Sequence, residues 1–250
     1  MNVSECGTLS GDAELAATVT ALRDIVPPGV VCAGGPIGLR TRADYPQEAT
    51  AIAHAVPARQ REFVAGRSYA RLAMAALSVA PQAIGVGASR APLWPAGIVG
   101  SISHGGGLCA ALVAHGHDFL GVGLDVETAA ALEADLVTHV CSEVELSSVP
   151  SSAARDGIDV PKLLFVIKEA VYKMYWPLAG HFLDFDDLQV DLIDSDRFRA
   201  TLSPDCPSVH GLRRFGGRYG RHQRHLFAVA ALGSHIQHAH SQKFVDSFEY

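Results

Sequence analysis

The chain has 250 residues, of which 48% are hydrophobic and 18% are charged, and its formal net charge is −6. This composition is typical of a globular protein with one large or two small domains and excludes a disordered chain. The negative charge argues against a protein that binds nucleic acid along its whole surface.

The first 56 residues are polar and interrupted by glycine and proline. They contain neither the basic segment nor the apolar run of a secretory signal, and no run in the chain is long enough to cross a bilayer. We therefore expect a cytoplasmic protein with no membrane partner. Within this part, only short apolar pieces such as residues 29–33 are interpreted as strands.

Pro57 opens the first strongly periodic segment. Apolar side chains recur at helical spacing from Phe63 to Leu77, and proline suits the first turn of a helix. We expect this helix to end before Pro81. Residues 82–97 are rich in glycine, proline and alanine and predict a loop.

Two apolar runs follow, at residues 109–114 and 119–126, and the residues 115–118 between them are typical of a tight turn. This pattern predicts a β-hairpin. Residues 128–146 are rich in alanine, leucine and glutamate and predict a helix, and residues 150–157 predict a loop.

A second periodic helix is expected to begin at Pro161 and to end at Pro177 and Gly180. Its apolar positions follow the spacing i, i+3, i+4 and i+7, at Ile167, Ala170, Val171 and Met174. The alternation at 188–192 predicts a strand, and the apolar run at 225–232 predicts a buried strand.

The order of these elements indicates an α/β (α+β) chain in two mixed halves, residues 1–118 and 119–250. Neither half is expected to depend on disulfides or on zinc held by thiolates, because the cysteines are odd in number and none lies in a Cys-x-x-Cys pair. Most are expected to be either small buried apolar residues or exposed thiols without a function. They are Cys6, Cys32, Cys109, Cys141 and Cys206.

Residues 121–127 (GVGLDVE) are the first stretch that indicates chemistry. Side chains at i and i+2 of a strand share a face, so Asp125 and Glu127 would present two carboxylates side by side. Such a pair repels unless a cation or solvent intervenes, and oxygen ligands of this kind suit Mg²⁺. A solvated strand end is an equal alternative. The Gly-x-Gly lacks the third glycine of a dinucleotide-binding motif.

Residues 165–173 (FVIKEAVYK) are the second such stretch. We expect Lys168, Glu169, Tyr172 and Lys173 to share the side of the helix opposite its apolar stripe. Glu169 and Lys173 have the spacing of an ordinary surface ion pair, which is common and weak. The alternative brings a third carboxylate and an ammonium beside the two acids of the strand. The composition of the helix does not decide between these readings.

Residues 93–104 are the third stretch, and they end in Ser103 and His104. These side chains can donate hydrogen bonds to a phosphate, although a satisfied turn is commoner. A catalytic Ser–His pair is not expected, because neighbours on a strand point to opposite faces. Three arginines with guanidinium groups suited to phosphate oxygens complete the set, unless they are solvated surface charges. They are Arg59, Arg67 and Arg90.

Four motifs occur in order between residues 57 and 180. They are ARxxEFxxGRxxAR at 58–71, PLWPxGxxGSxSH at 92–104, GxDxE at 123–127 and FxxKEAxYK at 165–173. In this combination the chain resembles the 4′-phosphopantetheinyl transferases of the Sfp/EntD type. The residues before and after this region match that family only loosely.

The resemblance implies two similar halves related by a pseudo-twofold axis, each a small, mainly antiparallel sheet packed on helices, with the active site in the cleft between them. It implies transfer of 4′-phosphopantetheine from coenzyme A (CoA) to a serine of an apo acyl or peptidyl carrier protein, with release of 3′,5′-ADP. Such a transfer needs charge neutralisation and in-line positioning more than covalent catalysis.

The resemblance also implies a role for each candidate residue. Mg²⁺ would be held by Asp125, Glu127 and Glu169. Glu169 would act as the general base, directly or through a water, and Lys173 would stabilise charge on the leaving phosphate. The residues implied to contact CoA are Arg59, Arg67, Arg90, Ser103, His104, Asp125, Lys168 and Lys173.

Two other functions stay open at this point. The same acids and cations would serve a Mg²⁺-dependent nucleotide or CoA phosphohydrolase, and a non-catalytic protein that binds CoA or a carrier is the third hypothesis. Fatty-acid, polyketide and nonribosomal-peptide carriers are all candidate partners. The 92–104 motif favours secondary metabolism or siderophore assembly. One chain would contain a complete cleft, so we expect a monomer.

Two further clusters are weighed on sequence alone. His235, His238 and His240 resemble a metal site but lack a matching acid, so a functional metal there is a minor alternative. Residues 197–224 contain seven arginines and the single acid Asp205, a local excess that would suit an acidic carrier protein. A solvated, loop-rich face is an equal interpretation.

Overall fold

The computed structural model describes residues 3–38, 42–87, 90–149 and 157–234. Its helices are α1 (Val3–Asp24), α2 (Pro46–Ala51), α3 (Pro57–Ala76), α4 (Ala134–Val140), α5 (Glu143–Ser147) and α7 (Val160–Ala179), with a 3₁₀ turn η2 (Phe185–Asp187). Its strands are β1 (Val30–Pro36), β2 (Gly85–Val86), β3 (Pro92–Leu93), β4 (Ile98–Gly105), β5 (Leu108–His115), β6 (Phe119–Thr128), β7 (Leu188–Leu192), β8 (Arg197–Leu202), β9 (Arg214–His222) and β10 (His225–Gly233).

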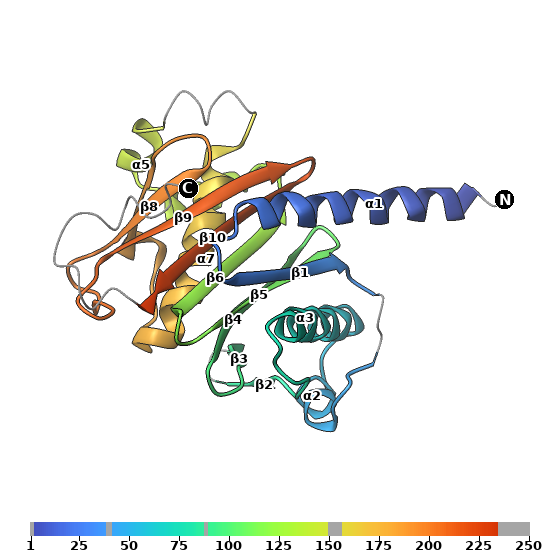
Figure 1. The fold of residues 1–250 in the computed structure, drawn as a ribbon. Helices are drawn as coiled ribbons and strands as arrows, with labels where there is room; N and C mark the ends of the chain where they lie inside the picture. Colours follow the sequence, from blue (N-terminus) through green and yellow to red (C-terminus); the bar gives the residue numbers. More distant parts are fainter. Residues whose placement is uncertain (1–2, 39–41, 88–89, 150–156, 235–250) are drawn as a thin grey trace.

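These strands form two principal antiparallel sheets, each packed on helices (Figure 1). The first has the order β1-β5-β4 and the second the order β6-β10-β9-β8-β7, with β2 and β3 as a separate small ribbon. The α+β class expected from the sequence is therefore confirmed.

Three apolar clusters hold the layers together. Helix α3 packs on the smaller sheet through residues such as Ala70 and Met74, and α7 packs on the larger sheet through Ile167 and Val171. Helix α1 covers a third cluster to which both sheets contribute, and its Leu22 is fully buried there. Burial of such apolar area is the main favourable term in folding.

The two periodic helices were predicted correctly. Pro57 stands in the first turn of α3, and Pro161 stands in the first turn of α7. Helix α7 continues through Pro177 and ends before Gly180, whose φ of 61° gives the left-handed cap that glycine favours. The strands expected at 188–192 and 225–232 are β7 and β10.

The predicted hairpin at 109–126 is wrong. β5 pairs with β1 and β4, whereas β6 pairs with β10, so the turn between β5 and β6 carries the chain from one sheet to the other. β5 is buried on both faces, as suits the central strand of its sheet. Apolar runs indicate that strands are present but do not determine which strands pair.

Several elements differ from the predictions or were missed. The helix expected at 128–146 divides into α4 and α5, because Ser142 forms a capping box with Glu145 and starts a new helix. Helix α1 was missed because its sequence is only weakly amphipathic. Strand β9 was also missed, although buried positions alternate along it at Phe215, Gly217 and Tyr219.

Gly123 allows β6 to lie directly against α7. A Cβ at this position would overlap the carbonyl oxygen of Ala170 and approach the backbone nitrogen of Met174 to 2.9 Å. Two residues further along β6 is Asp125, and one residue before Ala170 is Glu169. The glycine therefore brings the acids of the strand next to Glu169, the one acid of the helix.

We expect Gly123→Ala to destabilise the protein by about 1–3 kcal/mol or more, because two backbone segments would have to separate. Thermal unfolding measures this loss. The matched control is Gly11→Ala in α1, where an added Cβ meets nothing within 4 Å. That control should leave stability unchanged or raise it slightly. Equal melting temperatures for the two variants would contradict the close approach.

Candidate active site

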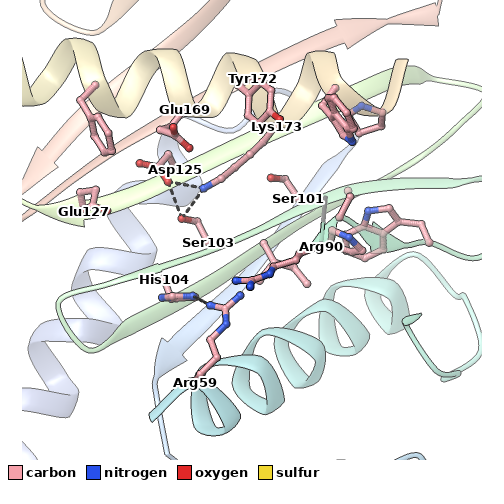
Figure 2. A pocket seen from close by; sticks show the side chains of 18 residues that line it. Arg59, Arg90, Ser101, Ser103, His104, Asp125, Glu127, Glu169, Tyr172 and Lys173 are labelled. Atoms are coloured by element: carbon pink, nitrogen blue, oxygen red, sulfur yellow. Dashed lines mark hydrogen bonds and ion pairs between the residues drawn. The ribbon is translucent and has the colours of Figure 1, made fainter. Parts of the chain in front are cut away.

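A cavity of about 380 Å³ opens between the two sheets (Figure 2). Strand β4 and helix α3 supply one wall, and β6 and α7 supply the other. All but two of the residues predicted for the site line this cavity. Those that line it are Arg59, Arg90, Ser103, His104, Asp125, Glu127, Glu169 and Lys173.

Asp125 is the most buried acid of the cavity, with 4% of its surface exposed. Its Oδ1 accepts hydrogen bonds from Lys173 Nζ at 2.6 Å and from Ser103 Oγ at 2.9 Å. Its Oδ2 is buried and has no hydrogen-bond partner. An unsatisfied carboxylate oxygen is costly, so this atom is suited to receive a cation or a donor from a ligand.

Glu169 lies on α7 and faces the same cavity. Burial raises the pKa of its carboxyl, Asp125 and Glu127 raise it further, and the nearby Lys173 lowers it. Asp125 and Glu127 therefore act electrostatically on Glu169, which is the reading that brings a third carboxylate beside the two acids of the strand. Figure 2 shows Glu169 and Asp125 pointing toward each other above Ser103.

The sequence analysis missed Lys162. Its Nζ lies 2.9 Å from Glu127 Oε2 and 4.8 Å from the centre of the Phe165 ring. Lys162, Phe165, Glu169 and Trp176 are spaced three, four and seven residues apart, so they follow one stripe of α7. This polar and aromatic stripe is the signal that would have identified Lys162.

The raised pKa of Glu169 predicts how its substitution affects stability. Below the ordinary value of 4.5, the carboxyl is protonated in both the folded and the unfolded chain, so burial carries no penalty. As pH rises toward the raised pKa, the unfolded chain releases its proton first, and the folded state loses stability.

We therefore expect Glu169→Gln to raise the melting temperature at pH 7 without divalent cations, by about 2–4 °C per kcal/mol of penalty removed. The difference should disappear below pH 4.5. Thermal unfolding in a chelating buffer at several pH values measures both effects. A lower melting temperature for the variant at pH 7 would show that the ionised carboxylate is well accommodated.

The donor set fits a divalent cation such as Mg²⁺. Among the described residues, no group of three or more acidic, histidine or cysteine side chains is already arranged around a metal position. Nevertheless, the orphaned Oδ2 of Asp125 and the buried carboxyl of Glu169 are oxygen ligands of the kind that Mg²⁺ prefers. In this state Lys173 and Lys162 neutralise Asp125 and Glu127.

The opposite wall carries cations. Arg59 Nη1 lies 2.7 Å from His104 Nε2 and 3.2 Å from Glu62 Oε2. Because a guanidinium only donates, Nε2 accepts, and the ring proton of a neutral His104 belongs on Nδ1. Burial lowers the pKa of His104, and Arg59 and Lys173 lower it further. Glu62 and Asp125 act in the opposite direction. The lowered pKa favours the neutral imidazole.

The placement of Lys168 corrects the sequence analysis. Its side chain is 2% exposed, and its ammonium donates to Val140 O at 2.7 Å, Phe185 O at 3.0 Å and Glu145 Oε2 at 3.0 Å. These bonds use all three of its protons, so it does not face CoA. Because each residue of a helix turns by about 100°, Lys168 points into the core while Glu169 faces the cavity.

Arg67 also lies outside the cavity lining. It is buried on α3, where its Nε donates to Ile84 O at 3.5 Å and its guanidinium carbon stands 3.5 Å from the centre of the Phe63 ring. Burial lowers the pKa of Arg67 to about 10, so it stays charged at neutral pH. A CoA contact from Arg67 therefore stays a prediction.

The arginine-rich segment contributes no residue to the lining of the cavity. Arg197 and Arg218 pair with Asp194 and Asp196, which lie just before the arginine-rich segment and offset part of its charge. The histidines His235, His238 and His240 lie outside the described residues.

Four cysteines are free and buried in the described part of the chain. They are Cys32, Cys109, Cys141 and Cys206. Burial raises the pKa of the Cys109 thiol to about 12. In the described part of the chain, no helix combines the length and apolarity needed to span a bilayer.

Comparison with known proteins gives matches along most of the chain. Residues 47–114 match the model of the 4′-phosphopantetheinyl transferase N-terminal domain, and residues 121–228 match that of the 4′-phosphopantetheinyl transferase superfamily. The chain is 37% identical over 179 residues to 4′-phosphopantetheinyl transferase Svp of Streptomyces mobaraensis, covering 71% of this chain and 72% of Svp.

Two further relatives match over a shorter region. The chain is 39% identical over 146 residues to 4′-phosphopantetheinyl transferase Npt of Nocardia iowensis, covering 58% of this chain and 65% of Npt. It is 33% identical over 145 residues to 4′-phosphopantetheinyl transferase PptT of Mycobacterium tuberculosis (strain ATCC 25618 / H37Rv), covering 58% and 63%. The aligned region thus spans 63% to 72% of the length of these relatives.

Proposed function

The chain belongs to the 4′-phosphopantetheinyl transferase superfamily, and from this membership we propose that it transfers the 4′-phosphopantetheine group of CoA to a serine of an apo carrier protein. The reaction releases 3′,5′-ADP. The observation that carries this proposal is one cavity with cations on one wall and a carboxylate cluster with a lysine on the other.

The two walls suit the two ends of a long polyanionic ligand. Arg59, Arg90 and His104 offer cationic or hydrogen-bonding groups for the adenosine phosphate. The negative charge of a bound phosphate would raise the pKa of His104, against the effect of burial, and would favour the protonated imidazole. The pyrophosphate then lies toward Asp125 and Lys173 on the opposite wall.

Asp125, Glu127 and Glu169 would hold Mg²⁺, and the bound ion supplies neutralisation of the pyrophosphate charge. Lys173 is close enough to Asp125 to add a second positive charge at the same place. Lys162 keeps Glu127 in position through its ion pair. The chain's own residues thus fix the geometry in which the phosphate is attacked.

The chemical step replaces a phosphoanhydride bond of CoA with a phosphoester bond to the carrier serine. The carrier serine oxygen forms a bond to the β-phosphorus of CoA, while the bond from that phosphorus to the bridging oxygen breaks. Glu169 accepts the serine proton, directly or through a water, and the raised pKa of its carboxyl suits this role. Lys173 stabilises the negative charge that develops on 3′,5′-ADP as it leaves.

The working unit follows from the same cavity. We propose that residues 1–118 contribute the CoA-binding wall and residues 119–250 contribute the acids and the catalytic helix. Because one chain supplies both walls, we propose that the protein acts as a monomer. We also propose that it acts in the cytoplasm. The Trp-Pro and Ser-His segment at 92–104 supports a carrier protein of secondary metabolism or siderophore assembly as the partner.

Mass spectrometry of a panel of apo carriers tests the function. With CoA and Mg²⁺, a fatty-acid, polyketide or nonribosomal-peptide carrier should gain the mass of one phosphopantetheine group. Release of 3′,5′-ADP without any carrier would favour a phosphohydrolase instead. Tight CoA binding without transfer to any carrier would favour a binding protein. Preference for a fatty-acid carrier would contradict the proposed pathway class.

We expect Arg59→Gln to raise the KM for CoA by about 10–100-fold while kcat changes little, because one charge-assisted hydrogen bond to a phosphate is lost. The comparison substrate is dephospho-CoA, which lacks the 3′-phosphate. With that substrate the variant and the unaltered protein should have similar KM values. Steady-state kinetics with both substrates measures the difference.

Arg61→Gln is the matched control, because Arg61 lies on the same helix and is exposed. It should leave both KM values unchanged. If Arg59→Gln weakened CoA and dephospho-CoA equally, Arg59 would not recognise the 3′-phosphate.

A further inference from the structure

The edges of the two sheets meet at strands β4 and β6, beside the cavity. β4 is the outer strand of the smaller sheet and β6 is the outer strand of the larger one. Leu124 N donates to Ser101 Oγ at 3.0 Å, and Val126 N donates to Ser103 Oγ at 3.1 Å. Residue numbers rise together across these bonds, so the two strands run parallel.

Hydroxyl groups thus take the place of the carbonyl oxygens that would pair two strands of one sheet. An edge strand otherwise leaves its N–H groups without partners, and burying them in that state is unfavourable. Both serines are 4% exposed, so water does not supply these bonds. Their spacing of two residues places them on the same face of β4.

The two strands also approach each other closely at Gly105. A Cβ there would overlap the carbonyl oxygen of Val126 and come within 2.9 Å of the Cα of Glu127. The glycine and the two serines therefore act over one short stretch of each strand. That stretch includes Asp125, between the two residues whose N–H groups are bound.

Ser103 uses its full hydrogen-bonding capacity here. Its hydroxyl donates to Asp125 Oδ1 at 2.9 Å and accepts from Val126 N and from Lys173 Nζ, the latter at 3.3 Å. A hydroxyl has one proton and two lone pairs, so none is left for a phosphate. The CoA contact expected of this hydroxyl from the sequence would require one of these bonds to break.

We propose that Ser101 and Ser103 are positioning residues that join the two sheet edges and so hold Asp125 and Lys173 in register with Arg59 and His104. This inference rests on the proposed function for its effect on CoA. His104 directly follows Ser103 in β4, so a shift of one edge along the other changes the distance between the two walls. A ligand that contacts both walls is sensitive to such a shift.

Hydrogen exchange tests the bonds without any substrate. In Ser101→Ala the amide of Leu124 should exchange about tenfold faster or more, and in Ser103→Ala the amide of Val126 should do so, because each loses its acceptor. The amides of β5, which pair within the smaller sheet, should keep their protection. Unchanged protection of Leu124 and Val126 in both variants would overturn the proposal.

Kinetics tests the consequence for the site. Ser101→Ala removes a hydroxyl whose partner is a backbone N–H, so the KM for CoA should rise about tenfold with a change in kcat of less than about threefold. Ser103→Ala should lower kcat as well, because Asp125 and Lys173 both lose a partner.

Thr18→Val is the matched control. The Thr18 hydroxyl is fully buried and also joins the two halves, through a contact of 3.0 Å with His222 Nδ1. This variant should lose thermal stability but keep the KM for CoA and the protection of Leu124. An equal rise in KM in Thr18→Val and Ser101→Ala would show a general loosening and overturn the positioning role. If no carrier is modified by the unaltered protein, the proposed function fails, and the exchange result still decides whether the serines join the sheets.

Discussion

Asp125→Asn should lower the rate of phosphopantetheine transfer by about 10²–10³-fold or more while the protein remains folded. The amide has the size of the carboxyl but carries no charge. It would remove the negative charge that balances the ammonium of Lys173, whose Nζ lies 2.6 Å from Asp125 Oδ1. It would also remove a negative oxygen ligand at the buried Oδ2 position. Quantitative mass spectrometry of the carrier measures the loss.

Asp118→Asn is the control for this substitution. Asp118 is a half-exposed residue just before β6, and its carboxylate lies 3.4 Å from Nε2 of the exposed His117. This variant should transfer at the rate of the unaltered protein. Addition of Mg²⁺ should raise the melting temperature of the control but not that of Asp125→Asn. Transfer by Asp125→Asn at more than about a tenth of the unaltered rate would remove Asp125 from the catalytic cluster.

The periodic segments allowed most of the catalytic wall to be predicted from sequence. The apolar stripe of α7 fixed which side of that helix is buried, and the alternation along β6 placed Asp125 and Glu127 on one face. The motif resemblance then joined these two elements. The structure adds the reason they meet, which is the absence of a side chain at Gly123.

The error at Lys168 arose because its partner is distant in the sequence. Lys168 follows the apolar Ile167 and precedes Glu169, so a boundary residue was assigned to the wrong side of the helix. Its partner Glu145 lies more than twenty residues away on α5, and nothing in the local pattern indicates that pairing. A buried lysine is stable only when such partners exist. The periodicity of the sequence does not reveal these partners.

The contacts between the two halves of the chain were the other feature that could not be predicted from sequence. The sequence indicates Ser101 and Ser103 only as residues suited to a turn or to a phosphate. Their acceptor role depends on β6 lying parallel to β4, which follows from the sheet topology and not from either segment alone. The same reason explains the wrong hairpin, since β5 and β6 adjoin in sequence but belong to different sheets.

Lys173→Met should lower kcat by about 10²–10³-fold, because the side chain keeps most of its length but loses the charge that faces the leaving phosphate. It should also change the pH dependence of the remaining activity. Glu169 must be ionised to accept the serine proton, so activity rises with pH through the pKa of that carboxyl. Lys173 lowers this pKa, and its removal should move the acid limb of the profile to higher pH.

Lys162→Met provides the comparison, because it removes an ammonium from the same helix. Lys162 pairs with Glu127 and is not among the groups that shift the pKa of Glu169. Its acid limb should therefore stay where it is in the unaltered protein, whatever its effect on rate. Profiles of kcat against pH at saturating CoA and Mg²⁺ measure both variants. A shift of equal size in Lys162→Met and Lys173→Met would mean that the limb reports the total charge of the cavity and not the ionisation of Glu169 beside Lys173.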